Sequence, residues 1–171
     1  MTGQANRPDL TKLTLTLYWG SIFLGLTLPW IVRIAHEVYA GHVPWMDALQ
    51  SLHRQLFAPG YNLFLVGAMN AAPFAIFALF VLFHLGRAHL CEPAIIPRRI
   101  GGALGGATVL LGVSLWAHIG TVVYPDAQGA LVYFFLPFYL SILIPLGYAV
   151  GRRLGRGWGG RLPDRDRAVG E

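Results

Sequence analysis

Cysteine is almost absent from this chain, with Cys91 the single example among 171 residues. One thiol permits no disulfide within the chain, which excludes a thiol–disulfide relay across a membrane. Lysine is equally scarce, since Lys12 stands against twelve arginines. No glycine-rich loop carries the lysine that a phosphate-binding motif needs. Scarce lysine beside abundant arginine, glycine and alanine is typical of GC-rich bacterial genomes.

Motifs of catalysis and of nucleic-acid binding are missing too. The sequence has no Gly-x-Ser-x-Gly nucleophile elbow and no pair of carboxylates within an apolar run, so nothing in it argues for an enzyme. The arginine-rich C-terminal segment lacks interleaved aromatic residues apart from Trp158. We therefore expect no nucleic-acid partner.

Acidic and basic residues are absent from four apolar runs of 20 to 25 residues. A hydrocarbon core of about 30 Å needs about 20 helical residues, so each run is long enough to span a membrane. Lipid-spanning strands alternate apolar and polar residues, and these runs do not. The sequence predicts an all-α, polytopic membrane protein with a four-helix transmembrane bundle. The predicted spans are 13–32, 61–85, 100–123 and 129–150.

The basic residues are distributed unevenly between the connections. Eleven of the thirteen lie in the N-terminus, the connection after the second run and the C-terminal segment, whereas only Arg33 and Arg54 lie in the other two connections. Because cytoplasmic segments carry the excess of Lys and Arg, we expect both termini to be cytoplasmic in a bacterial inner membrane. We expect the first run to remain part of the mature chain. The alternative is that it is a signal peptide and is cleaved.

The sequence indicates one domain without internal repeats. A cytoplasmic N-terminus (1–12) precedes the membrane domain (13–150), and a basic tail (151–171) follows it. The Gly, Arg and Asp content of the tail predicts disorder. Its six arginines could bind anionic lipid at roughly 1 kcal/mol each, or they could only fix the orientation.

The first external connection contains an amphipathic pattern. Apolar residues recur at helical spacing after Pro44, and polar residues occupy the remaining faces. This pattern predicts a short helix on the outer membrane surface, or one that caps the bundle. Its apolar residues are Trp45, Leu49, Leu52 and Leu56.

The third run carries small residues on two opposite faces. Small residues at four-residue spacing let helix backbones approach closely, so this helix is expected to be central. One face contains Gly101, Gly105 and Gly112, and the other contains Ala103 and Ala107.

Polar residues from all four runs fall in one half of the predicted membrane domain. They are Thr27, Asn70, Ser114, His118 and Tyr133. An unpaired amide in hydrocarbon costs several kcal/mol, so Asn70 needs a partner, and Ser114 is the first candidate. Tyr133 is the candidate partner of His118. The layer is either a set of interhelical hydrogen bonds or the lining of a small cavity open to the outside.

Histidines raise the question of a metal or haem. The external candidates are His36, His42 and His53, with His118 deeper, but their spacing matches no familiar ligand pattern. His84 and His118 come out about 27 Å apart in depth, which excludes one haem between them. No cofactor is therefore predicted.

Pro73 lies in the second run, and Pro137 and Pro145 lie in the fourth. Each should bend its helix, which is common in transporters and also in static bundles. The sequence contains no intramembrane carboxylate and no inverted repeat that would favour a transporter. We expect a non-catalytic accessory, assembly or interaction subunit, with a membrane-protein partner or as a homo-oligomer. The alternatives are an oligomeric carrier of small solutes or ions and a metal- or redox-binding membrane protein.

Overall fold

The computed structural model describes residues 10–59, 62–86, 95–124 and 129–156, and these residues form five helices and no strand. All the helices except the second are long and apolar enough to cross a membrane. This confirms the prediction of an all-helical chain with four such segments. The predicted N-terminal segment before residue 10 and the tail after residue 156 lie outside the described residues. The helices are α1 (Leu10–Tyr39), α2 (Trp45–Gln55), α3 (Leu63–Gly86), α4 (Ile96–Val123) and α5 (Gly129–Leu154).

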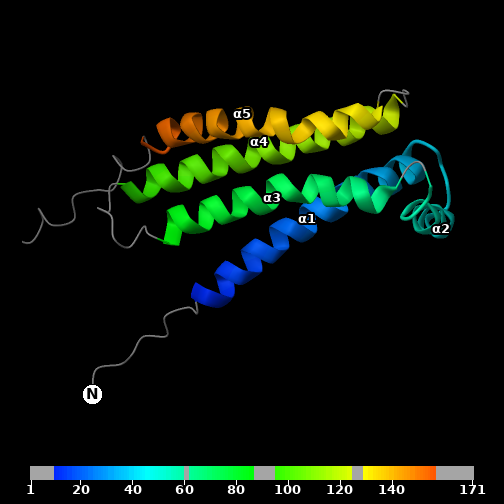
Figure 1. The fold of residues 1–171 in the computed structure, drawn as a ribbon, viewed down its shortest axis with the longest axis horizontal. Coiled ribbons are helices and arrows are strands. Elements are labelled where there is room, and N and C mark those ends of the chain that lie inside the picture. Colours follow the sequence, from blue (N-terminus) through cyan, green and yellow to red (C-terminus); the bar gives the residue numbers. More distant parts are fainter. Residues whose placement is uncertain (1–9, 60–61, 87–94, 125–128, 157–171) are drawn as a thin grey trace, which may run out of the picture.

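The four long helices associate in two pairs, α1 with α3 and α4 with α5 (Figure 1). The contacts between the pairs are less extensive than those within them. The first half of α1 diverges from α3, whereas α4 and α5 run side by side (Figure 1). A core with side chains from every long helix joins the pairs. Its buried members are Leu28, Phe74, Leu110, Ala117, Leu136 and Leu140.

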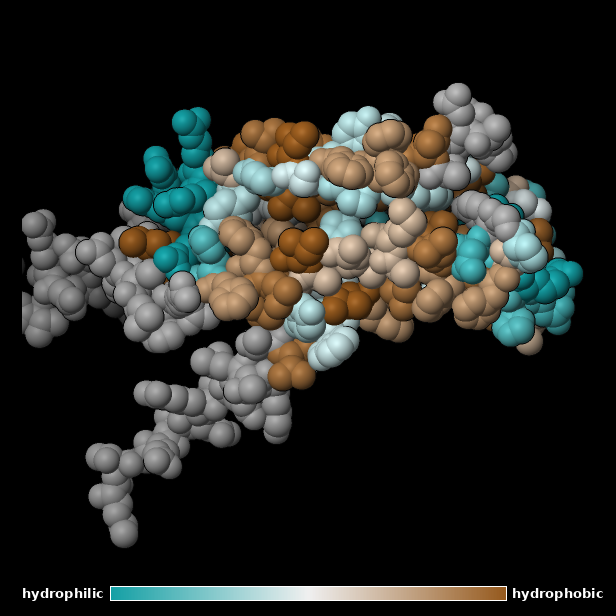
Figure 2. All heavy atoms as spheres, in the orientation of Figure 1, coloured by the Kyte–Doolittle hydropathy of each residue, from teal (hydrophilic) through white to brown (hydrophobic). Residues whose placement is uncertain are grey.

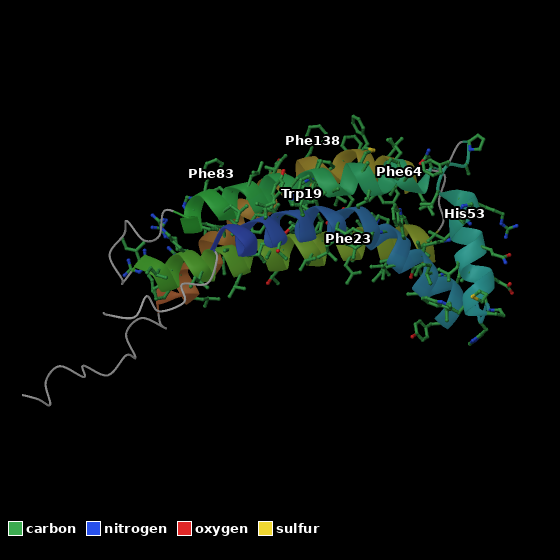
Figure 3. The ribbon with its side chains drawn as sticks, turned by 90° about the horizontal axis from the view of Figure 1, so that it is seen from below. Trp19, Phe23, His53, Phe64, Phe83 and Phe138 are labelled. Atoms are coloured by element: carbon green, nitrogen blue, oxygen red, sulfur yellow. The ribbon has the colours of Figure 1, made fainter. Side chains whose placement is uncertain are left out.

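The two ends of the molecule are polar and its middle is apolar. Figure 2 shows hydrophilic residues at both ends and hydrophobic residues between them on the visible face. We call the end at which α3 stops and α4 starts the arginine end, and the other the α2 end. The aromatic residues that Figure 3 labels on the long helices are exposed on the outside of the molecule. The arginine end carries Arg98, Arg99, Arg152, Arg153 and Arg156.

Two long helices extend beyond their predicted ends. α1 continues seven residues past Val32, and α5 reaches Leu154 rather than Val150. In α1 the extra turns contain Arg33 and Glu37, whose side chains form an ion pair at 2.9 Å between Nε and Oε1. Residues four apart on a helix are neighbours, so these charges support the helix instead of ending it.

A tight turn separates α1 from α2. The backbone N–H groups of Ala40 and Gly41 both donate to the carbonyl of His36, and His42 adopts a left-handed conformation with φ 52°. Pro44 then precedes the first residue of α2. The turn sets α2 across the long axis of the molecule, as the two perpendicular views show (Figures 1 and 3).

Candidate functional site

One side-chain hydrogen bond, from Ser51 to Glu37, joins helix α2 to the end of α1, and it belongs to a chain of three such bonds. Oε1 of Glu37 accepts hydrogen bonds from Nε of Arg33 (2.9 Å) and from Oγ of Ser51 (3.2 Å), and Nε2 of Gln55 donates to Oγ of Ser51 (3.1 Å). Ala48 on the same side of α2 is fully buried. The hydrogen bond between Ser51 and Glu37 and the buried Ala48 define which side of α2 faces the rest of the molecule.

The exposed part of α2 has an apolar arc next to a polar one. Trp45, Met46 and Leu49 are 56%, 68% and 36% exposed and lie within about 100° of each other at 100° per residue. Exposed His53 is the polar residue within this arc. The exposed residues of the next arc are Gln50, Arg54 and Asp47. The boundary with the buried side is formed by half-buried Leu52 and Leu56.

Sequence reasoning included Trp45 and Leu49 in this surface and missed Met46. The position of Met46, three residues before Leu49, is the signal that could have found it. Met46 and Leu49 also line a shallow hollow of about 390 Å³ on α2, together with His53 and Arg54. The candidate interaction surface is therefore Trp45, Met46 and Leu49, bordered by polar residues.

The side chain of Asn70, a residue of α3, faces α1. It is 3% exposed, and its Nδ2 donates to the carbonyl of Gly25 at 2.7 Å. The expected hydrogen bond from Asn70 to Ser114 is wrong, because Oγ of Ser114 has no hydrogen-bond partner among the described residues. Thr27 donates to the carbonyl of Phe23 within its own helix, at 2.8 Å.

His118 and Tyr133 meet through their rings. The ring centroids are 5.1 Å apart and the planes are inclined by 28°, so the contact is a stack. His118 is 1% exposed, and neither ring nitrogen has a hydrogen-bond partner among the described residues. The hydroxyl of Tyr133 shares a short hydrogen bond with Oγ1 of Thr121. Thr121 was outside the predicted polar layer, although it follows His118 by three residues.

Four buried polar atoms in this layer have no partner within the described part of the chain. They are Oδ1 of Asn70, Oγ of Ser114, and Nδ1 and Nε2 of His118. Ser114 and His118 are one turn apart and therefore lie on the same side of α4. Together these groups can donate and accept hydrogen bonds, and they bring no carboxylate.

The histidines considered as metal ligands are dispersed. His118 is buried in α4 and stacked on Tyr133, whereas His53 is exposed on α2 (Figure 3). His36 and His42 lie in the last turn of α1 and the turn after it. Across the described residues no group of three or more His, Cys, Asp or Glu side chains could hold a metal ion.

The glycines of α4 differ in their surroundings. A Cβ added at Gly101 would lie 2.5 Å from the carbonyl oxygen of Gly151, and one added at Gly105 would collide with that of Gly147. These two positions therefore require glycine. At Gly112 an added Cβ would meet nothing within 4 Å, so the close contact does not extend to this residue.

The sequence analysis did not identify the other glycines of the same interface. Gly147 and Gly151 of α5 and Gly155 directly after it recur every four residues and approach α4 backbone, and this spacing is visible in the sequence. On α4, Gly102 accommodates the ring of Tyr148 and Gly106 that of Phe77, while Ala103 and Ala107 are half-buried.

Comparison with protein-family models, with curated proteins and with solved structures finds no match. Functional inference for this chain therefore rests on its own geometry.

Proposed function

We propose that this chain is a non-catalytic, multi-pass protein of a bacterial cytoplasmic membrane that acts as an accessory, assembly or interaction subunit. The observation that carries the proposal is the α2 surface: Trp45, Met46 and Leu49 are exposed on a helix that the hydrogen bond from Ser51 to Glu37 and the buried Ala48 attach to the end of α1. A fixed apolar surface with a polar border resembles the anatomy of a protein interface.

The orientation follows from the distribution of basic residues. The arginine end would face the cytoplasm, because the excess of Lys and Arg marks cytoplasmic segments. The apolar middle seen in Figure 2 has the arrangement that a bilayer requires. Since α2 crosses the long axis of the molecule, it would lie along the outer surface of the membrane with Trp45 at the interface (Figure 1).

The partner that fits α2 best is a membrane protein with an apolar contact surface at the same interface. Trp and Met are enriched at interface centres, and charged and amide side chains at the rim. Here Trp45 and Met46 would form the centre, and Asp47, Gln50 and Arg54 the rim. A homo-oligomer formed through the same surface would be a different outcome.

Purification from native membranes in mild detergent, followed by mass spectrometry, tests this proposal. We expect one partner in stoichiometric amount, and about tenfold less of it with the double variant Trp45→Ser, Met46→Ser, because apolar interface anchors cost 1 kcal/mol or more each when removed. The matched control is Asp47→Ser, Gln50→Ser on the polar arc of the same helix. Equal loss in both double variants, or homo-oligomers alone, would contradict the proposal.

A carrier of small solutes or ions is the second candidate. The observation that favours it is that four buried polar atoms, on Asn70, Ser114 and His118, have no hydrogen-bond partner among the described residues. An ionisable side chain within a membrane segment often marks a pathway for ions or protons. In this alternative His118 would contact the solute, with Ser114 one turn away.

A further inference from the structure

A groove of about 450 Å³ separates the two helix pairs along α3 and α5. Its walls are almost entirely apolar and include Phe77 and Phe80 of α3. Ser141 is the one hydroxyl residue in the groove besides Tyr148, and its Oγ already donates to the carbonyl of Phe138 at 2.7 Å. The groove is therefore a surface for hydrocarbon and not for a polar solute.

The groove has the length of one membrane leaflet. It extends along α5 from Pro137 to Tyr148, which is about 16 Å at 1.5 Å per residue. A leaflet occupies about half of a hydrocarbon core of about 30 Å. On α3 the groove begins near the middle of the helix at Ala72 and Pro73 and reaches Phe80, whereas on α5 it begins eight residues after Gly129 and ends at Tyr148, six residues before Leu154. The groove therefore spans the middle of α5 and continues along α3 toward the arginine end.

Aromatic rings close the groove at the arginine end. Phe80 stacks on His84 with centroids 4.6 Å apart, and Tyr148 contacts both rings edge-on, at 5.3 and 5.8 Å. Directly beyond these rings, Nη1 of Arg99 donates to the carbonyl of His84 at 2.6 Å. This contact places a guanidinium from α4 beside the last turn of α3.

A second guanidinium comes from α5. Arg152 follows Tyr148 by four residues, so it lies on the face of α5 that lines the groove, about 40° from Tyr148. Arg153, by contrast, is about 140° away from Tyr148. Arg152 and Arg153 are both exposed. Toward the arginine end, the apolar groove is therefore followed first by the aromatic rings and then by Arg99 and Arg152.

We propose that this groove binds an anionic phospholipid, with one acyl chain between α3 and α5 and the phosphate held by Arg99 and Arg152. A guanidinium carries five N–H donors and pairs with phosphate through two of them, so Arg99 can hold the carbonyl of His84 and a phosphate oxygen together. Basic pockets between helices at the cytoplasmic side are known sites for anionic lipid. The site rests on the proposed membrane location and is independent of partner binding by α2.

Lipid titration of the purified, delipidated full-length protein followed by native mass spectrometry tests the site. The probes are dioleoyl phosphatidylglycerol and dioleoyl phosphatidylcholine, which share their acyl chains and differ in charge. We expect preferential binding of phosphatidylglycerol, and about fivefold weaker binding in Arg152→Gln, which corresponds to roughly 1 kcal/mol per arginine near the surface. Arg153→Gln is the matched control, because it removes the same charge from the adjacent residue and should bind as the wild type does.

A second pair of variants tests the groove itself. Ala72→Phe places a ring in the groove from an exposed position and should reduce binding of both lipids. Ala68→Phe makes the same change one turn earlier on α3, at an exposed position that does not line the groove, and should have no effect. A thermal unfolding curve for each variant identifies any loss caused by misfolding.

Four outcomes would overturn the lipid site. They are equal binding of the two lipids, equal loss in the two arginine variants, equal loss in the two alanine variants, or a dimer that Ala72→Phe abolishes, because a second copy would then occupy the groove. Extraction of cell membranes with alkaline carbonate separates these failures from failure of the membrane location. Release of the chain by carbonate overturns both, whereas a retained chain without phosphatidylglycerol binding overturns the lipid site alone.

Discussion

The two helix pairs reach close contact at different places and by different means. α4 and α5 come closest at the arginine end, where the backbone at Gly101 and Gly105 meets the backbone at Gly147 and Gly151. α1 and α3 diverge at that end (Figure 1). Their contact is made nearer the α2 end, where hydrogen bonds run from the side chains of one helix to the backbone of the other.

The hydrogen bonds between α1 and α3 are directional. Nδ2 of Asn70 donates to the carbonyl of Gly25, and Nε1 of Trp30 donates to the carbonyl of Leu63 at 3.0 Å. Gly67 contributes as well, since a Cβ there would collide with the carbonyl oxygen of Leu26. In hydrocarbon, packing and hydrogen bonds replace the hydrophobic effect as the forces between helices. The α4–α5 pair depends mainly on backbone packing and has one side-chain hydrogen bond, between Thr121 and Tyr133. The α1–α3 pair has two hydrogen bonds from side chains to backbone carbonyls.

The largest effect is expected from filling the glycine contact of the second pair. Gly151→Val would drive a Cβ into the carbonyl of Gly101, and because backbone cannot move away as a flexible side chain can, we expect a loss of about 3 kcal/mol or more in unfolding free energy. Unfolding in mixed detergent micelles measures the loss. Gly112→Val is the control at an open position and should change stability little. Similar losses in both variants would contradict a specific role for the contact.

A smaller effect is expected nearer the α2 end of the same pair, where His118 stacks on Tyr133. His118→Ala removes a buried ring and should cost about 2 kcal/mol. His118→Phe keeps a ring for the stack and removes two nitrogens without partners, so stability should be nearly unchanged. Unfolding curves of the two variants measure this difference.

The same variants separate packing from a carrier role. For a packing role, proteoliposomes with His118→Phe should show the same H⁺ and K⁺ flux as the wild type. Loss of a measurable wild-type flux in His118→Phe, with the unfolding curve intact, would favour the carrier over packing.

The sequence was sufficient for the number and kind of long helices. A run of about 20 residues without charge has few alternatives to a helix in lipid, so four such runs gave four helices. The residues at which the helices end were less predictable. α1 continues through Arg33 and Glu37 because these residues pair with each other, and a span defined by the absence of charge cannot include them.

The contacts of the candidate site were predicted only in part, because a helix sequence does not reveal its neighbour. Gly101, Gly105 and Gly112 share a face of α4, yet α5 has no glycine between Gly129 and Gly147 to meet the third of them. The amide of Asn70 pairs with a backbone carbonyl, and carbonyls are present at every position of every helix. Residue types alone therefore pointed to Ser114.

The smallest effect is expected in the first pair, at Asn70. Asn70→Leu removes the hydrogen bond to Gly25 and also removes a buried oxygen that has no partner, so the two changes offset each other. Interhelical hydrogen bonds in membranes contribute about 0.6 to 1.7 kcal/mol, and we expect a net loss of about 1 kcal/mol or less in detergent unfolding. Thr108→Val is the control, because the exposed Thr108 hydroxyl bonds only within its own helix. A loss as large as that of Gly151→Val would mean that α1 and α3 depend on their polar contacts as strongly as α4 and α5 depend on their glycines.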